Sequence, residues 1–276
     1  MLVLVGFLIV TAAIIGGYLL EHGNLAVLVQ PAELVIIGGA AVGTLVAGNP
    51  LSVIKKIFSG ILGTLRGSAY TKSQFLETLQ MMFDLFSHVR KVGISGIEAD
   101  VDEPSKSAVF TKYPKFLKDH HALQFVCDTL RTYTSGMVDQ HELDLLMELD
   151  IEAHHEEKAT PVSALSTVAD SLPGLGIVAA VLGVIITMGA LGGPPEEIGH
   201  KVAAALVGTF LGILLCYGFL GPLASSMTKA NEAEGSYYRC LQQGILSFVK
   251  GAAPIIAIEF ARRSLPNDVR PSFKEM

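Results

Sequence analysis

Long apolar stretches without Asp, Glu, Lys or Arg dominate the pattern of this chain. They cover residues 2–20, 34–51, 171–193 and 202–224. A helix needs about 20 apolar residues to cross the hydrocarbon core of a bilayer. We therefore predict four transmembrane helices. The first stretch lacks a basic start and a clear cleavage site, so we expect a retained helix and not a signal peptide.

The positive charges are distributed unevenly between the segments that join these stretches. Of the 20 Lys and Arg residues, 12 lie in 51–169, seven lie in 225–276, and the remaining one is Lys201. An excess of Lys and Arg marks the cytoplasmic side of a membrane protein. The chain is therefore expected to keep both termini, the long middle segment and the tail inside. The short connectors 21–33 and 192–201 are then outside.

The long middle segment shows helical spacing and no alternating strand pattern. Phe75, Leu79, Met82 and Phe86 recur every three to four residues behind a possible capping box at 71–74. Gly93 is expected to end this helix. Further helices are predicted at about 119–134 and from Asp139 onward, with Gly136 between them.

The tail is also predicted to be helical, with one apolar face. That face is formed by Tyr237, Leu241, Ile245 and Phe248. The later run PIIAIEFA carries Glu259 and is too short for a fifth span. We predict an all-α membrane protein with a large helical cytoplasmic insertion and a helical cytoplasmic tail. The expected parts are 1–54 (helices 1 and 2), 55–169 (insertion), 170–225 (a hairpin of helices 3 and 4) and 226–276 (tail).

Composition agrees with a membrane protein and argues against binding to nucleic acid. Hydrophobic residues make up 50% and charged residues 17%, whereas soluble domains carry about 25% charged residues. The formal net charge is −6, and no basic stripe is apparent. The cysteines, Cys127, Cys216 and Cys240, share no short spacing, which favours reduced thiols over a disulfide framework.

No pattern typical of an enzyme active site, a cofactor site or a metal site is found. The run 153–157, AHHEE, resembles a metal cluster, but neighbouring helical residues point about 100° apart and do not converge. His120 and His121 have no recognised metal spacing to Cys127 or His141. We expect no catalytic residues, no cofactor and no metal.

Small residues give the predicted membrane helices smooth faces. Gly208 and Gly212, and also Gly39 and Gly43, match the spacing that permits close helix approach. The third stretch adds small residues at 174, 176, 179, 180 and 183. The third and fourth helices are expected to form an antiparallel hairpin, because only about nine residues join them. The smooth faces suit packing within this hairpin or against another chain.

Two prolines lie toward the cytoplasmic ends of this hairpin. Pro173 suits the first turn of a helix, where Asp170 or Ser171 could cap it. Pro222 comes late in its helix, where it frees a carbonyl near Gly218 and can kink the helix. We expect the prolines at similar depth, and the kink at Pro222 suits a hinge or a polar spot beside an ion path.

The predicted spans contain no ionisable residue at depth. Glu33 and Asp170 lie at their edges, and Thr187 and Thr209 are the hydroxyls deep in the hairpin. Each threonine could bond back to its own helix or face a pore. An ion-relaying membrane protein keeps a carboxylate or histidine at depth. Either this chain moves no ions and only scaffolds, or a partner supplies the carboxylate.

Two segments of the hairpin carry a resemblance to a known family. VADSLPGLGIVAAV at 168–181 and ALVGTFLGILLCYGFLGPLA at 205–224 resemble the MotA family of flagellar-motor stator subunits, within the wider group of the ExbB and TolQ energisers. The tail segments IAIEFARR and RPSF extend the resemblance over nearly the whole chain. ExbB and TolQ resemble only the hairpin and have three spans.

The resemblance implies a mechanism that explains the missing carboxylate. Chains of this family form a ring, expected to be a pentamer, around a dimer of a MotB-type single-span partner with a membrane aspartate. Protons pass by way of that aspartate near the third and fourth helices, and the flux turns the ring. The cytoplasmic insertion then pushes on FliG, the rotor's switch protein. The expected location is the bacterial inner membrane.

The resemblance also assigns roles to single residues. Pro173 and Pro222 match two prolines linked to ion flow and conformational coupling. Arg90 and Glu98 match a charged pair that engages the rotor, and Asp128 matches a further charged position there. Exposed charges suit a contact that must form and release at every step, because they steer encounters more than they add affinity.

The choice of ion is argued from positions 180, 208 and 209. Sodium-driven relatives carry Thr where Ala180 stands and a Thr pair where Gly208-Thr209 stands. Sodium needs several oxygen ligands, whereas a proton needs only the carboxylate. The resemblance therefore predicts proton coupling. The alternatives to a stator are an ExbB- or TolQ-type energiser of outer-membrane processes and a passive membrane scaffold.

Overall fold

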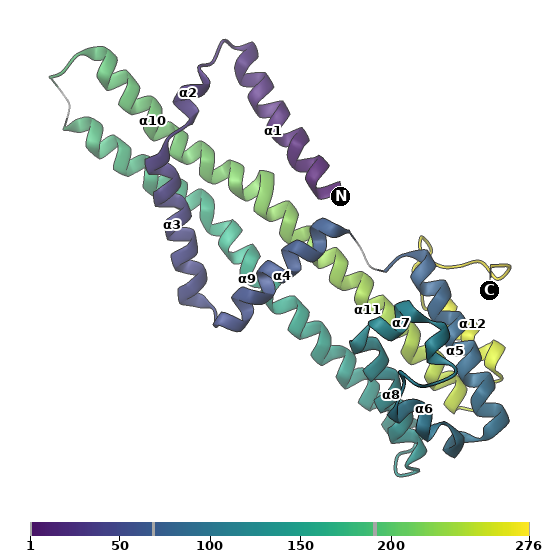
Figure 1. Ribbon diagram of the computed structural model, residues 1–276. Helices are drawn as coiled ribbons and strands as arrows, with labels where there is room; N and C mark the ends of the chain where they lie inside the picture. Colours follow the sequence, from purple (N-terminus) through teal and green to yellow (C-terminus); the bar gives the residue numbers. More distant parts are fainter. Residues whose placement is uncertain (1, 68–69, 190–191, 276) are drawn as a thin grey trace. The chain divides into compact units, whose positions relative to one another are not determined.

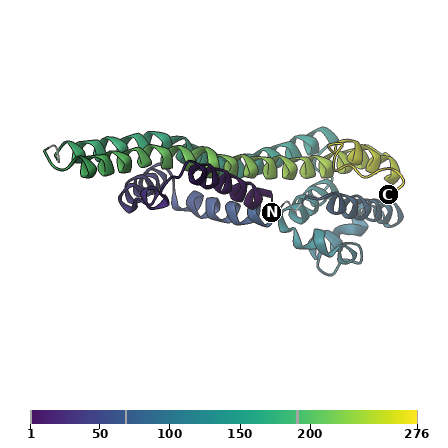
Figure 2. The same ribbon diagram turned by 90° about the horizontal axis from the view of Figure 1, so that it is seen from above.

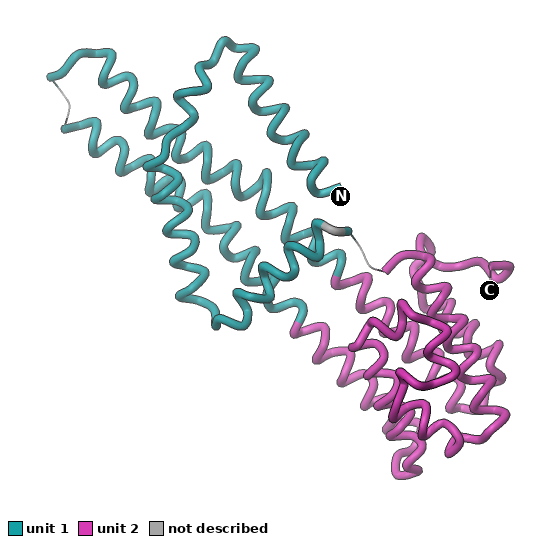
Figure 3. The backbone as a smooth tube through the Cα atoms, viewed as in Figure 1, with its two compact units in different colours: residues 1–67, 158–230 teal, residues 68–157, 231–276 magenta. Residues whose placement is uncertain are grey.

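The computed structural model describes residues 2–67, 70–189 and 192–275. Within these ranges the regular structure is entirely helical, which confirms the predicted all-α class (Figure 1). Residues 190 and 191, part of the predicted stretch 171–193, lie outside the described residues. The chain divides into two compact units, each made of two separate stretches of sequence (Figure 3).

Unit 1 comprises residues 1–67 and 158–230. Its helices are α1 (Leu2–Leu20), α2 (Leu25–Leu28), α3 (Pro31–Gly48), α4 (Leu51–Arg66), α10 (Pro195–Ile213), the π-helix η3 (Leu214–Leu220) and parts of α9 (Gln140–Met188) and α11 (Gly221–Val249). Among the described residues, four helical runs are long and apolar enough to cross a membrane: Leu2–Leu20, Leu25–Gly48, Gln140–Met188 and Pro195–Val249. The four predicted spans are thus confirmed.

Close contact between α9 and α10 forms the centre of unit 1, where the two helices run side by side in both views (Figures 1 and 2). A methyl group added to Gly212 would lie 2.5 Å from the carbonyl oxygen of Leu172 and 2.9 Å from Gly176 Cα. One added to Gly183 would lie 2.7 Å from Ala205 Cβ. These glycines therefore serve packing within the chain, whereas Gly39 and Gly43 face open space.

The third predicted span begins differently from the expectation. α9 is one continuous helix of 49 residues, and Pro173 lies in its interior. Pro173 therefore does not start a helix, and the expectation of a cap by Asp170 or Ser171 is wrong. Ser171 Oγ instead donates to the carbonyl of Val168 at 2.7 Å, as hydroxyls do within helices.

The helix α4 extends unit 1 beyond the predicted boundary at residue 54. It begins after Pro50, and its apolar face buries Ile57 in a cluster with Leu165, Leu223 and Met227. The two Lys residues at 55 and 56 lie on its exposed side. The sequence division at 54 and 55 therefore falls inside a helix that packs on the hairpin.

Unit 2 comprises residues 68–157 and 231–276. Its helices are α5 (Lys72–Val92), the 3-10 helices η1 (Ile94–Ile97) and η2 (Phe110–Lys112), α6 (Glu98–Asp102), α7 (Pro114–Lys118), α8 (His120–Thr134), α12 (Pro254–Arg263) and the remaining parts of α9 and α11. The predicted helices in the insertion are confirmed. Gly93 ends α5 with a positive φ of 81°, which glycine adopts without strain.

The insertion and the tail share one hydrophobic core in unit 2. The predicted apolar faces of α5 and α11 are both buried in it. Phe86 and Phe248 stack with ring centroids 4.4 Å apart, and the hydroxyls of Thr78 and Tyr237 lie 2.9 Å apart. α12 also packs against α5. Neither segment buries these faces alone, so unit 2 requires both.

The capping box expected at the start of α5 is not formed, whereas one is formed at the start of α9. Thr71 is the N-cap residue of α5, but its side chain makes no capping hydrogen bond. Asp139 Oδ1 accepts from the backbone N–H groups of His141 and Glu142, and Glu142 accepts from the N–H of Asp139. These bonds hold the pKa of Asp139 below its usual range and complete a capping box at the start of α9.

Substituting Gly212 tests whether the α9–α10 contact stabilises unit 1. Gly212→Ala should lower the free energy of unfolding by about 1–3 kcal/mol, because backbone atoms on α9 cannot make room for the methyl group. Thermal unfolding in detergent measures the effect. Gly174→Ala is the matched control, since a methyl there meets nothing within 4 Å. Equal stabilities of the two variants would contradict the packing role.

The ion pairs of Glu259 make the stability of unit 2 depend on pH. Hydrogen bonds from Arg262 and Arg263 lower the pKa of Glu259 to about 2 from 4.5. A depressed pKa in the folded state contributes stability above the unfolded pKa, and this is lost as pH falls through the folded value. Glu259→Gln should therefore destabilise at pH 7 by about 1 kcal/mol. Thermal unfolding curves in which Glu259→Gln is destabilised equally at pH 7 and near pH 2 would contradict this.

Candidate functional site

The residues predicted for ion flow all lie in unit 1, on α9, α10 and α11. Ala180 on α9 and Gly208 on α10 face one another: a methyl group on Gly208 would lie 3.2 Å from the backbone nitrogen of Ala180. Thr209 Cα would lie 3.3 Å from a methyl on Gly176. The structure thus brings Ala180, Gly208 and Thr209 to one level of the hairpin.

The two prolines lie at different levels of the hairpin, and neither lies at the level of Ala180 and Gly208. The hairpin register sets Leu172 against Gly212, while Leu165 shares a cluster with Leu223. Pro222 therefore lies beside the level of residue 166, about seven residues or roughly 10 Å along α9 from Pro173. The expectation of similar depth is wrong, because the register of the pair, and not the distance from the apolar boundary, decides which residues are level.

A π-helix precedes Pro222. Residues Leu214–Leu220 form η3, and the N–H of Gly221 donates to the carbonyl of Cys216, five residues earlier. Proline has no N–H to donate, so the helix cannot keep its regular bonding there. Such wider turns inside α-helices often occur at functional positions. Phe219 on η3 contacts Phe7 on α1, with ring centroids 5.1 Å apart.

The two threonines of the hairpin have different roles. Thr187 Oγ1 donates to the carbonyl of Gly183 at 2.8 Å, so it is bonded to its own helix. Thr209 is half-buried, and among the described residues its hydroxyl has no hydrogen-bond partner. Of the two, Thr209 is therefore the hydroxyl available to a neighbouring chain or ion.

The carboxyl of Glu33, which was expected at the edge of a span, is buried in the structure. Glu33 is 6% exposed in the first turn of α3, and its Oε2 has no hydrogen-bond partner in the described chain. A methyl group on Gly208 would approach that oxygen to 2.5 Å. Glu33 thus lies against the hairpin at the level of Gly208 and not merely at the edge of a span. The signal in the sequence was a lone acidic residue ahead of an apolar run.

The charged residues predicted to contact a rotor lie in unit 2 and differ in their bonding. Arg90 donates to the carbonyls of Gly251 at 2.8 Å and Ala252 at 2.9 Å, and its guanidinium lies 5.8 Å from the centre of the Phe248 ring. It therefore binds the turn that joins α11 to α12. Glu98 begins α6, is exposed, and has no ion pair in the described residues.

Asp128 is engaged with a neighbour. Its Oδ1 accepts from Arg131 at 2.6 Å, and Arg131 also bonds Asp102 at 3.0 Å. Within the described ranges, the structure brings neither Arg90 nor Asp128 into an ion pair with Glu98. Of the predicted charges, Glu98 is therefore the one with the fewest internal bonds.

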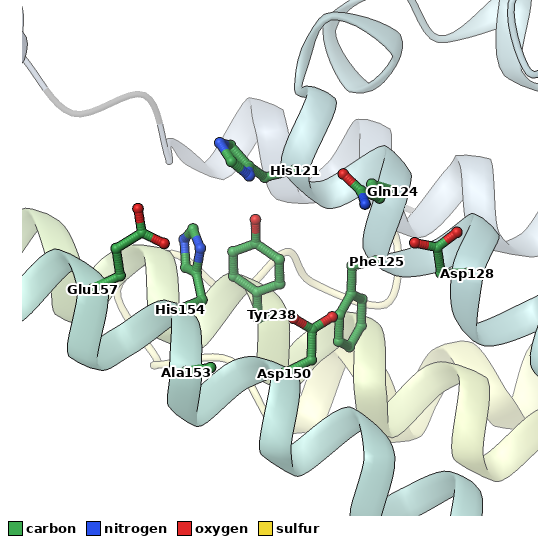
Figure 4. Close-up of a pocket in the computed structure, with 9 residues that line it drawn as sticks. All are labelled: His121, Gln124, Phe125, Asp128, Asp150, Ala153, His154, Glu157 and Tyr238. Atoms are coloured by element: carbon green, nitrogen blue, oxygen red, sulfur yellow. The ribbon is translucent and has the colours of Figure 1, made fainter.

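Asp128 also borders a polar cavity of about 320 Å³ in unit 2 (Figure 4). His121, Asp150, His154 and Tyr238 line it. His154 Nε2 lies 3.0 Å from Glu234 Oε1. Burial, with the nearby charges of Asp119 and Glu234, raises the pKa of Tyr238 well above its usual range. No group of three or more metal-binding side chains is assembled among the described residues.

Comparison with known families covers most of the chain. Residues 4–93 match the family described as "Motility protein A N-terminal", and residues 118–239 match the "MotA/TolQ/ExbB proton channel family". Motility protein A of Escherichia coli (strain K12) is 41% identical over 276 residues, which is all of this chain and 94% of that protein. Chemotaxis protein LafT of Vibrio parahaemolyticus is 35% identical, covering 98% and 95%.

Solved structures have the same fold. A structure titled "Structure of C. jejuni MotAB" aligns with a TM-score of 0.81 over 98% of both chains at 17% identity. The flagellar MotAB stator complex from Bacillus subtilis aligns with a TM-score of 0.75 over 93% and 92% at 22% identity. The identity to the curated relatives extends over both units and all four spans. The chain therefore belongs to the motility protein A family, within the MotA/TolQ/ExbB proton channel family.

Proposed function

We propose that this chain is a stator subunit of the bacterial flagellar motor, located in the inner membrane. The observation that carries the proposal is the 41% identity to a motility protein A over the full chain, spans and unit 2 alike. With a MotB-type single-span partner that carries a membrane aspartate, it forms a proton channel. The flow of protons rotates a ring of these chains, expected to be a pentamer, and so applies torque to the rotor.

The hairpin of α9 and α10 is suited to line a path and not to form one alone. Its inner face is closed by glycine contacts that leave no room for a pore. Its other side exposes Ile177, Val181 and Ile185, each more than half accessible. An apolar partner helix fits this surface, and a carboxylate on that helix would meet the Ala180 and Thr209 level. The π-helix η3 and Pro222 offer a segment that can change its hydrogen bonding as a proton passes.

We assign unit 2 to the cytoplasm, with both termini inside; the excess of Lys and Arg in 51–169 and 225–276 supports this orientation. There we assign the contact with the rotor protein FliG to Glu98 and Arg90. Asp128 is assigned a further part in the same contact. Glu98 is exposed and unpaired in the described chain, which suits a contact that forms and releases. The match of residues 4–93 to a family named for motility favours a stator over an energiser of outer-membrane processes.

Motility measurements test torque generation and the coupling ion together. A strain lacking this chain should be paralysed but carry normal flagella, and the wild-type chain should restore swimming. In sodium-free buffer the restored cells should keep swimming, and a protonophore should stop them, because Ala180 and Gly208 offer no side-chain oxygen to sodium. Normal swimming of the deletion strain, or a motor that stalls without sodium, would contradict the proposal.

Charge reversals in unit 2 separate rotor contact from folding. Glu98→Lys should abolish torque while leaving thermal stability unchanged, because Glu98 has no internal bond to lose. Arg90→Glu should also abolish torque, leave membrane insertion intact, and lower stability by about 1–3 kcal/mol through its lost carbonyl bonds.

Lys91→Glu is the matched control for stability, since Lys91 neighbours Arg90 at the exposed end of α5 and makes no ion pair in the described chain. The readouts are the rotation speed of tethered cells, the swimming speed of free cells and the thermal unfolding of the purified chain. Wild-type torque in Glu98→Lys would remove this residue from the rotor contact. Loss of the Arg90→Glu chain from the membrane would make Arg90 purely structural.

A further inference from the structure

Glu33 is a carboxyl group held out of water inside unit 1. Its side chain is 6% exposed, and the oxygen Oε2 is buried with no hydrogen-bond donor among the described residues. A carboxylate buried without a partner is costly when it is charged, and in a membrane span such a group is usually functional. A purely apolar side chain would fill the same space at lower cost, so packing alone does not explain Glu33.

The backbone of α10 is adapted to this carboxyl. Glu33 Oε2 occupies the space that a side chain at position 208 would need, since a methyl group there would lie 2.5 Å away. Ala179 Cβ and the backbone nitrogen of Ala180 line the same spot, at 3.1 and 3.2 Å from that methyl position. The carboxyl therefore lies where α3, α9 and α10 meet. Gly208 is about six residues, or roughly 9 Å, inside the apolar stretch that starts at 202.

No cationic side chain neutralises Glu33 in the described chain. The nearest charged residue along α10 is Lys201, which is paired with Glu197 at 2.9 Å. Both Lys201 and His200 lie at least seven residues from Gly208. Glu196 lies further out on the same helix, and Asp170 on α9 is exposed, ten residues from Ala180. On α3 itself Glu33 is the one ionisable residue. Within the described chain this carboxylate therefore has no balancing group, and a bound cation can supply the positive charge.

The surroundings favour a proton over a metal cation. Sodium requires several oxygen ligands, but positions 179, 180 and 208 are Ala, Ala and Gly and offer no side-chain oxygen. On α10 the side-chain oxygen nearest to Gly208 along the sequence is the hydroxyl of Thr209. One carboxylate oxygen is sufficient to bind a proton.

We propose that the Glu33 carboxyl is a second proton-binding site of the channel, contributed by this chain at the level of Gly208. The inference rests on the proposed function, in which protons cross beside this hairpin. A proton from water on the outer side forms an O–H bond with Glu33. That bond breaks when the proton moves on to the carboxylate that the partner supplies, and Glu33 returns to its charged form.

Infrared difference spectroscopy on the complete complex with its single-span partner tests protonation directly. In membranes at neutral pH, the wild type should show a C=O stretching band of a protonated carboxyl that Glu33→Gln removes. Glu21→Gln, which changes an exposed carboxylate on the neighbouring connector, should leave that band unchanged. A spectrum that is identical in wild type and Glu33→Gln would overturn the inference. So would a band that sodium removes, because sodium would then be the ligand.

Proton uptake into vesicles containing the complex tests the role in transport. Glu33→Gln should reduce uptake several-fold while the complex still assembles, and Glu33→Asp should restore part of it. Gly208→Ala should reduce uptake as well, since its methyl group displaces the carboxyl although Glu33 is retained. Equal uptake by wild type, Glu33→Gln and Gly208→Ala would overturn the inference and leave the stator function intact. A wild-type complex that takes up no protons would instead overturn the proposed function.

Discussion

The contact between α9 and α10 is the constraint on which the membrane unit depends. Backbone atoms of the two helices approach so closely at Gly176 and Gly212 that a single added methyl group has no space. In a bilayer there is no hydrophobic driving force between helices, so such close packing supplies much of their attraction. The same contact sets the register of the hairpin, and the register decides which residues are level with one another.

That register explains how a hairpin with so few polar groups can serve an ion path. It brings Ala180 and Gly208 together, with Thr209 next to Gly208 on α10, and leaves room for the carboxyl of Glu33 from α3. The π-helix η3 and Pro222 lie further along, away from that level. The contact of Ala180, Gly208 and Glu33 and the π-helix are thus at different levels of the membrane unit.

Unit 2 depends on a different constraint, the shared core of the insertion and the tail. Its apolar faces are complementary halves, joined by the stacked pair Phe86 and Phe248 and by the buried hydroxyls of Thr78 and Tyr237. Arg90 belongs to this framework through its bonds to the turn between α11 and α12. A residue assigned to rotor contact therefore also holds the core in place. Glu98, without such bonds, is the cleaner probe of that contact.

The sequence by itself determined the helices, because helical spacing and apolar length are local properties. The four spans, the helical insertion, the break at Gly93 and the helix start at Asp139 were all predicted from neighbouring residues. Only the tertiary structure decided which distant residues meet. It made Pro173 an interior residue of α9, set the two prolines at different levels, buried Glu33 against Gly208, and bonded Arg90 to the turn after α11. These outcomes depend on helix register and on backbone contacts between segments far apart in the chain, which no local pattern of residues specifies.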